Sequence, residues 1–256
     1  MAAVPLHYTI EGAGPHVVLL HPVGLDSTFL APVAAELSRR YTVLLADQRG
    51  HGQSPTSSAP NGLDDYADDI HALLANLAFA PAATIGFSFG GMVAQALALR
   101  HPEDVAALVP CACPSTLTPQ ARTIAAERAA EAERGGMSAM VEATLARWFT
   151  EKFRSSGAAE PTRKRLLSDD PKGWAEAWRA IARIDALPRL AAVRVPALCI
   201  AGEKDVASPP AMLRAIAGAI PGARYAELPG APHMLFIEQP QATAREILGF
   251  LDQVFE

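Results

Sequence analysis

Short apolar runs alternate with longer amphipathic segments along most of this chain of 256 residues. The alternation is typical of parallel strands joined by helical crossovers, because each helix carries the chain back to the edge where the next strand begins. Runs such as VVLL and LCIA are apolar at every position, which indicates a sheet covered by helices on both faces. The predicted strands are residues 6–11, 16–21, 42–46, 83–87, 107–112, 197–202 and 223–228, and the predicted core helices are residues 32–40, 64–77, 91–101, 209–220 and 241–255.

One region, from about residue 114 to residue 185, interrupts this alternation. It contains no convincing strand, and its periodicity is helical throughout, with glycines and prolines between the helical segments. Because a predicted strand precedes it and another follows it, we interpret the region as a helical insertion between two strands of the sheet. The predicted organisation is therefore one α/β core, residues 1–113 and 186–256, with a helical cap, or lid, at residues 114–185.

The composition argues against several classes of protein. Hydrophobic residues make up 50% of the chain and charged residues 19%, so it has material for a core and lacks the signature of disorder. The formal charge is −5, and no cluster of Lys and Arg could neutralise several phosphates at once, which argues against a nucleic-acid partner. No window approaches the ~18 apolar residues of a membrane span, and the first residues do not form a secretory signal. We expect a cytoplasmic protein with no membrane partner.

The three cysteines, Cys111, Cys113 and Cys199, each fall in or beside an apolar run. We therefore expect buried, free thiols in a reducing compartment. Cys111 and Cys113 lack the spacing of a redox or zinc pair, and no His-Glu-x-x-His run accompanies them. The sequence predicts neither a metal site nor a cofactor.

One serine stands between glycines where a predicted strand meets a predicted helix, in the stretch TIGFSFGGM. Gly86-x-Ser88-x-Gly90 at such a junction is the nucleophile-elbow pattern, in which the glycines permit a tight turn that exposes the serine oxygen. A plain strand-to-helix turn is the alternative, since glycines also flank serines in ordinary loops. A serine hydroxyl is a poor nucleophile without a base, so another part of the chain must supply one.

Asp205 and His233 are the candidate partners of Ser88. Each follows a predicted strand, so each would lie at the edge of the sheet where ligand sites of open α/β sheets form. The order serine, acid, histidine along the chain is the order of this type of fold. His233 alone among the seven histidines follows the last strand in a loop flanked by Gly and Pro. Glu203 is a rival for the role of the acid, and Asp205 could instead be a turn residue or a helix cap.

Acyl transfer also needs hydrogen-bond donors that face the developing oxyanion. The elbow would supply the backbone amide of Phe89. A second donor should come from the loop after the strand at residues 16–21, where Pro22 has no N–H and Val23 is the candidate. We interpret His21 as a structural residue of that loop rather than as a second base.

The chain resembles the α/β-hydrolase superfamily, and five stretches carry the resemblance in this order: LLHPVGLDS, LLADQRGHGQS, GFSFGGMVAQALALRHPE, VPALCIAGEKD and GAPHMLFIEQP. The resemblance implies the α/β-hydrolase fold, a mostly parallel central sheet flanked by helices. It also implies a catalytic triad of Ser88, Asp205 and His233, and an oxyanion hole formed by the amides of Val23 and Phe89. Within the superfamily the chain is most similar to the 3-oxoadipate enol-lactonase and carboxylesterase group, through ARWFTEKFR, AGEKDVASPP and HMLFIEQPQ.

By analogy with that group, Trp148 would line a substrate pocket beneath the cap. Phe149 is explained equally well as part of the apolar seam between cap helices. A carboxylate on the substrate would need a cation nearby, and Arg147, Lys152 and Arg154 are the candidates.

The predicted function is a cofactor-free serine hydrolase that cleaves small carboxylic esters or lactones through an acyl-enzyme, similar to the enol-lactonases. Two alternatives use the same residues. The first is a ligand receptor on a hydrolase fold, with slow or single turnover, and the second is a cofactor-free perhydrolase, in which peroxide replaces water. The predicted partner is a small-molecule ester or lactone, and we expect a monomer or a homodimer.

Overall fold

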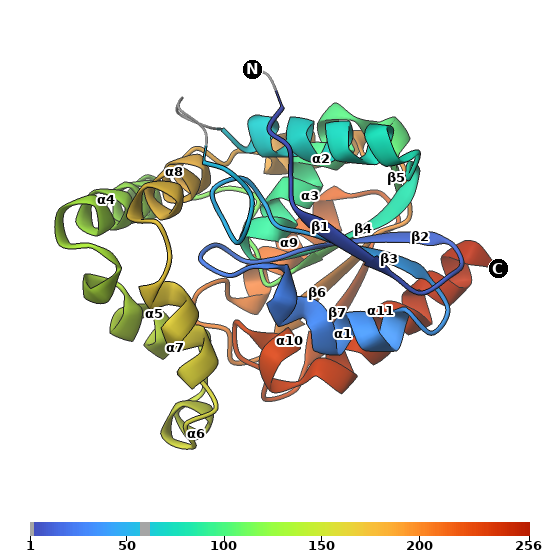
Figure 1. The fold of residues 1–256 in the computed structure, drawn as a ribbon. Coiled ribbons are helices and arrows are strands. Elements are labelled where there is room, and N and C mark those ends of the chain that lie inside the picture. The colour runs from blue at the N-terminus through green and yellow to red at the C-terminus, as the bar shows by residue number, and fades with distance from the viewer. Residues whose placement is uncertain (1–2, 57–61) are drawn as a thin grey trace.

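The computed structural model describes residues 3–56 and 62–256, in which seven strands form one sheet flanked by helices (Figure 1). Residues 1–2 and 57–61 of the predicted core lie outside the described residues. All seven predicted strands are confirmed, with their ends shifted by no more than two residues. They are β1 (Tyr8–Glu11), β2 (His16–Leu20), β3 (Thr42–Ala46), β4 (Ala82–Phe87), β5 (Val105–Cys111), β6 (Leu198–Gly202) and β7 (Arg224–Leu228).

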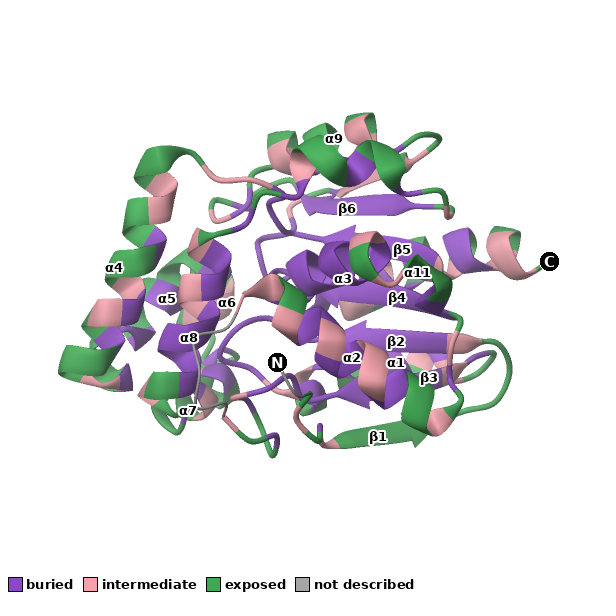
Figure 2. Ribbon diagram, turned by 90° about the horizontal axis from the view of Figure 1, so that it is seen from above, coloured by how far each residue is buried: buried purple, intermediate pink, exposed green. Residues whose placement is uncertain are grey.

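The strand order in the sheet is β1-β3-β2-β4-β5-β6-β7. Only the edge strand β1 is antiparallel to its neighbour among the described pairings, and all four of its residues are exposed (Figure 2). The central strand β4 is buried at every position, including Thr84, as its mostly apolar sequence predicts. Because the remaining strands are parallel, the loops that follow β2, β4, β6 and β7 meet at one edge of the sheet.

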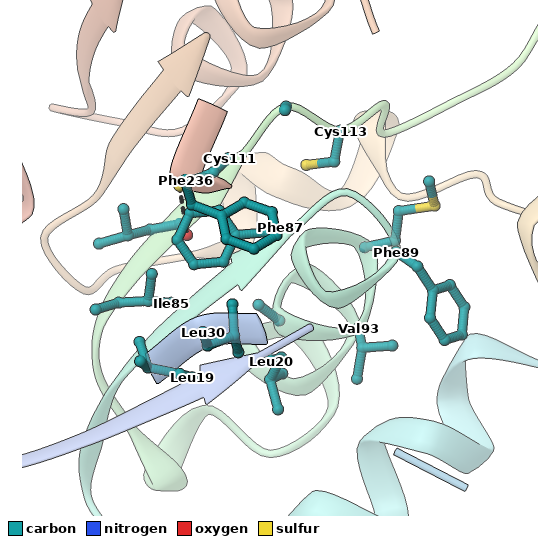
Figure 3. Packing of buried hydrophobic residues seen from close by; sticks show 14 of the residues in the cluster. Leu19, Leu20, Leu30, Ile85, Phe87, Phe89, Val93, Cys111, Cys113 and Phe236 are labelled. Carbon is teal, nitrogen blue, oxygen red and sulfur yellow. Dashed lines mark hydrogen bonds between the residues drawn. The ribbon is translucent and has the colours of Figure 1, made fainter. Parts of the chain in front are cut away.

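Helices cover both faces of the sheet, and α1 packs against α11 on one face while α2 packs against α3 on the other (Figure 1). The first ten residues of α3, Phe89 to Ala98, are all buried, because this helix packs against the central strands β4 and β5. On the face of α1 and α11, Phe87 at the end of β4 packs against Phe236, with ring centroids 4.6 Å apart (Figure 3). The core helices are α1 (Ala31–Leu37), α2 (Leu63–Leu77), α3 (Phe89–Arg100), α9 (Pro210–Ala219), α10 (Leu235–Glu238) and α11 (Pro240–Phe255).

Between β5 and β6 the chain forms five α-helices that gather beyond one end of the sheet (Figure 1). In sequence α4 and α8 are far apart, yet they pack along each other. These five helices lie within residues 114–185, which we continue to propose as the cap. They are α4 (Pro119–Gly135), α5 (Val141–Trp148), α6 (Glu151–Ser155), α7 (Glu160–Leu167) and α8 (Pro171–Ala182).

Within the region of helical periodicity, residues 137–153 do not form one continuous helix, because α5 ends at Trp148 and α6 begins at Glu151. Phe149 ends α5 in an extended conformation, and the Thr150 side chain accepts a hydrogen bond from the amide of Phe153 to begin α6. Glu238 of the core accepts hydrogen bonds from the amide and the hydroxyl of Thr150, at 2.7 and 2.9 Å. The break therefore depends on a contact between the cap and α10 that helical periodicity does not encode.

The predicted state of the cysteines is confirmed, since Cys111, Cys113 and Cys199 are all free and buried. Among the described residues, none of the helices is both long and apolar enough to cross a membrane.

A buried carboxylate lies in the turn between α7 and α8. Only 7% of Asp169 is exposed, and its Oδ1 lies 2.9 Å from Nη2 of Arg165. Burial raises the pKa of Asp169 to about 7, although Arg165 acts in the opposite direction; the charges of Asp26 and Asp170 raise it further. The folded chain therefore binds a proton at this position in a pH range where the unfolded chain has already released it.

We expect Asp169→Asn to remove a pH-dependent part of the stability. Between the ordinary aspartate pKa of 3.8 and the folded value of about 7, the protonated carboxyl stabilises the folded state, and this contribution is lost as the pH rises. Relative to the Asn variant, the wild-type free energy of unfolding should fall by about 1 to 3 kcal/mol from pH 5 to pH 8. Urea unfolding of both proteins at each pH measures their free energies of unfolding. If the difference between the two proteins does not change with pH, the raised pKa of Asp169 is contradicted.

Candidate active site

Ser88 lies in the sharp turn between β4 and α3. Its backbone has φ 53° and ψ −113°, a conformation that side-chain-bearing residues adopt rarely, and its amide donates a 2.8 Å hydrogen bond to Cys111 O. A Cβ at Gly86 would come closer than 3.0 Å to Gly90 O, and one at Gly90 would come as close to Leu20 O. The two glycines of the predicted pattern are therefore required by the close approach of backbone to backbone.

Three side chains from distant parts of the sequence form a hydrogen-bonded series. Ser88 Oγ lies 2.9 Å from His233 Nε2, and Asp205 Oδ2 lies 2.8 Å from His233 Nδ1. All three are buried, with 7%, 3% and 4% of Ser88, Asp205 and His233 exposed. The loops that follow β4, β6 and β7 supply them, so the parallel sheet brings the three predicted residues together.

The geometry also separates the two candidates for the acid. The second oxygen of Asp205, Oδ1, accepts hydrogen bonds of 2.8 Å from the amides of both Ala207 and Ser208, which fix the carboxylate in the loop after β6. Glu203 is exposed, and its carboxylate accepts a bond from the amide of Gly230 instead. Asp205, not Glu203, therefore faces the histidine.

The two predicted oxyanion donors are the backbone amides of Val23 and Phe89. Phe89 is the first residue of α3, so its amide has no carbonyl partner within that helix. Val23 lines the same cavity as Ser88. Its amide is not a donor in any of the described backbone hydrogen bonds outside helices and strands. Both amides are thus available to a ligand oxygen.

His21 holds the loop that carries Val23. Its Nε2 accepts the amide of Gln48 at 2.9 Å, so the proton belongs to Nδ1, which donates to Pro22 O at 2.7 Å. Burial lowers the pKa of His21, against the smaller opposing effects of that hydrogen bond and of nearby carboxylates. A neutral imidazole with both nitrogens engaged is a structural residue, in agreement with the interpretation made from the sequence.

A cavity of about 160 Å³ opens above Ser88 and His233, between the core and the cap. Trp148 forms part of its wall, is 4% exposed, and has its ring 6.4 Å from the His233 ring. Phe149 is absent from the lining; it stacks on Phe153 at 4.9 Å, which places it in the seam between cap helices. The cavity is small and lined largely by apolar side chains.

Two arginines line this cavity, and the sequence analysis identified only one of them. Arg147 was a candidate, whereas Lys152 and Arg154 do not reach the cavity, and Arg154 forms an ion pair with Glu151. Arg128 of α4 was missed. It lies over the Trp178 ring at 4.9 Å, and in the described part of the chain no carboxylate lies within ion-pair distance of Arg128 or Arg147.

Burial lowers the pKa of Arg128 to about 10, and the like charge of Arg147 contributes in the same direction. The direction means that the surroundings of the guanidinium disfavour its charge. Arg128 follows Ala121 by seven residues and Ala125 by three, which puts all three on one face of α4. Its place on the small-residue face of this helix was the signal that could have identified it.

One cluster of side chains outside the cavity has the composition of a metal site. The potential ligand atoms of His71, His101 and Glu103 lie within 4.8 Å of one another. However, the two imidazoles are stacked with an interplanar angle of 5°, so their in-plane lone pairs do not converge on one point. Asp104 and Asp68 already hold one nitrogen of each ring, at 2.7 Å. We assign no metal to this cluster.

A serine at a strand-to-helix elbow, with a histidine and an aspartate delivered by later strands of a mostly parallel sheet, defines the class of α/β hydrolases. The chain belongs to this family: the sequence model of the alpha/beta hydrolase fold matches residues 15–240. The predicted fold class and the predicted family are thereby confirmed.

Individual relatives extend the match over nearly the whole chain. The enol-lactonase from Burkholderia xenovorans has 35% sequence identity and a TM-score of 0.92, covering 98% of this chain and 99% of that one. A pimeloyl-[acyl-carrier protein] methyl ester esterase from Chromobacterium violaceum is 32% identical, over 94% of this chain and 96% of its own. A 3-oxoadipate enol-lactonase from Acinetobacter baylyi is 28% identical, over 94% and 90%. The chain is a hydrolase whose relatives include esterases and enol-lactonases.

Proposed function

We propose that this protein is a serine hydrolase of small carboxylic esters or lactones that acts through an acyl-enzyme. The observation that carries the proposal is the hydrogen-bonded series Ser88–His233–Asp205 at the base of a cavity. Esterases and enol-lactonases among the relatives support the same substrate class. Nothing in the proposed reaction requires a cofactor.

In this mechanism Ser88 Oγ attacks the carbonyl carbon while His233 Nε2 takes the hydroxyl proton. Asp205 accepts the hydrogen bond from Nδ1–H and stabilises the imidazolium that forms. The amides of Val23 and Phe89 stabilise the oxyanion of the tetrahedral intermediate, each contributing roughly 3 to 4 kcal/mol. The imidazolium then protonates the departing alkoxide. In the second half, His233 removes a proton from water, which attacks the acyl-enzyme. The imidazolium then returns this proton to Ser88 Oγ as the acid leaves.

The substrate itself is proposed to carry a carboxylate. Two guanidiniums with no carboxylate partner in the described chain line a small, mostly apolar cavity. Arg147 is exposed, but Arg128 is partly buried in surroundings that disfavour its charge, so the absence of a counter-ion carries a cost there. A substrate carboxylate held by Arg128 and Arg147 would remove this cost, and it would orient the ester or lactone carbonyl towards Ser88.

Multiple-turnover kinetics on a matched panel test the proposal. The panel contains esters of a monoacid, half-esters of a diacid of similar size, simple lactones and an enol-lactone with a carboxylate. Sustained turnover with highest kcat/KM on the carboxylate-bearing members is expected. A single turnover that then stalls would instead indicate a ligand receptor, and peracid formation at low peroxide concentration would indicate a perhydrolase.

We expect Arg128→Met to lower kcat/KM for carboxylate-bearing substrates by roughly 10- to 100-fold, because one charged hydrogen-bonding partner is lost. Neutral esters of the same size should change less than about threefold. Arg134→Met is the matched control, since Arg134 lies on the same helix, exposed and outside the cavity. Equal losses on charged and neutral esters would show that Arg128 shapes the cavity rather than binds the carboxylate.

A further inference from the structure

An arginine of the cap bridges two carboxylates on opposite sides of the boundary between the cap and the core. Arg165 of α7 places Nε 2.6 Å from Asp26 Oδ2 and Nη2 2.9 Å from Asp169 Oδ1. The three side chains are 15%, 14% and 2% exposed, in the order Arg165, Asp26, Asp169. Because solvent screens such a pair poorly, the contact is stronger than an ion pair on the open surface.

Asp26 belongs to the segment at residues 21–27 that carries Val23, here named the oxyanion loop. Gln48 anchors the start of this loop, because its amide donates to His21 Nε2 at 2.9 Å and its side-chain Nε2 donates to His21 O at 2.6 Å. Its other end is held at Ser27, whose amide donates to the buried Asp47 at 2.8 Å. The donor Val23 lies between these two anchors, and Asp26 is the charged residue of the loop that faces the cap.

The cap also lies directly on this loop. Gly24 has φ +73°, and a Cβ there would come closer than 3.0 Å to the ring of Trp174 in α8 and within 2.7 Å of Leu166 in α7. No side chain could be inserted between loop and cap without moving one of them. The position of the Val23 amide therefore depends on where α7 and α8 sit.

We propose that Arg165 is a positioning residue for the oxyanion hole: by pairing with Asp26 it fixes the loop so that the Val23 amide points at the oxygen bound to the carbon that Ser88 attacks. The inference rests on the function proposed above. Arg165 is not among the residues that line the cavity, so it acts through the loop and not on the substrate. Its guanidinium has one nitrogen within ion-pair distance of Asp26 and another within that distance of Asp169, which the single ammonium group of a lysine would achieve less well.

Kinetics of Arg165→Met, Arg165→Lys and Asp26→Asn test the proposal, with Arg163→Met as the matched control. Arg163 lies on the same helix, but its partners Glu142 and Glu160 belong to the cap alone. We expect Arg165→Met to lower kcat by roughly 10- to 100-fold, with KM changed less than about threefold. The Val23 amide would remain but be displaced, so the loss of rate should be smaller than if this hydrogen-bond donor were removed. Arg165→Lys should recover part of this loss, and Arg163→Met should match the wild type.

A readout specific to the oxyanion separates positioning from a merely structural role. Addition of Ser88 Oγ to a trifluoromethyl ketone forms a tetrahedral adduct whose oxygen occupies the oxyanion hole, whereas the carboxylic acid product forms no such bond. Affinity for the ketone should fall by the same factor as kcat in Arg165→Met and in Asp26→Asn, with product affinity unchanged. The double variant should lose no more than Arg165→Met alone, because that variant already breaks the contact with Asp26.

Equal losses in ketone and product affinity, or ketone affinity that stays at the wild-type value, would overturn the proposal. If Arg165→Met does not fold, Asp26→Asn decides, since an asparagine oxygen can still accept the bond that Asp26 takes from the Thr28 amide. Failure of the proposed function itself is distinguishable, because the wild type would then show no Ser88-dependent turnover and no ketone adduct.

Discussion

Ser88→Ala should lower kcat on the best ester or lactone by a factor on the order of 10⁶. The alanine removes the hydroxyl that contacts His233 Nε2, so the nucleophile is lost and no acyl-enzyme can form. Steady-state turnover of wild type and variant measures the factor. Mass spectrometry after mixing with a slowly deacylated ester should detect an acyl group on the wild type only.

The fold of the Ser88→Ala variant serves as the control. Its thermal unfolding should remain close to that of the wild type, because the Ser88 amide keeps its bond to Cys111 O and only one side-chain contact is lost. A loss of kcat smaller than about tenfold, in a folded variant, would remove the triad from the mechanism.

Asp205→Asn should lower kcat by about 10⁴, with the fold retained. The asparagine oxygen can keep both bonds from the amides of Ala207 and Ser208, which turns its NH₂ group towards His233 Nδ1. That nitrogen must then accept, so the proton moves to Nε2. The imidazole would donate to Ser88 instead of accepting its proton, and the base would be in the wrong tautomer.

Glu203→Gln is the matched comparison for this variant. Glu203 lies two residues from Asp205, but its carboxylate accepts a hydrogen bond from the amide of Gly230, which a glutamine oxygen can also accept. Its kcat should stay within about threefold of the wild type. Comparable losses at the two positions would mean that the loop conformation, and not the tautomer of His233, sets the rate.

The features that the sequence predicted well are those encoded locally. Alternating apolar runs gave all seven strands, and the serine between glycines identified the elbow because backbone contacts exclude any side chain there. Asp205 and His233 could be predicted because parallel topology forces the loops after successive strands to one edge. Asp205 and Glu203 both follow the same strand, so their positions in the sequence do not distinguish them. The contacts seen in the structure do, because Asp205 bonds to His233 and Glu203 to Gly230.

What could not be predicted depends on contacts between segments that are far apart in the sequence. Arg128 lies on the small-residue face of α4, but the packing of this polar helix against α8 determines that this face turns towards the cavity. The break after Phe149 requires Glu238, which lies far away in the sequence. The contact of Arg165 with Asp26 similarly joins residues that no local pattern relates.

The three buried thiols give this protein a built-in reporter of its own opening. Burial raises the pKa of Cys111, Cys113 and Cys199, so these thiols stay protonated in the folded chain. Because alkylation requires an accessible thiolate, they should react only when the chain opens. The three cysteines lie on either side of the cap insertion in the sequence, in or beside β5 and β6. In the described chain these two strands pair at Cys111 with Ile200, and an isolated bridge joins Leu108 to Ala197. Pulsed alkylation would therefore time the separation of these two strands, without any engineered label.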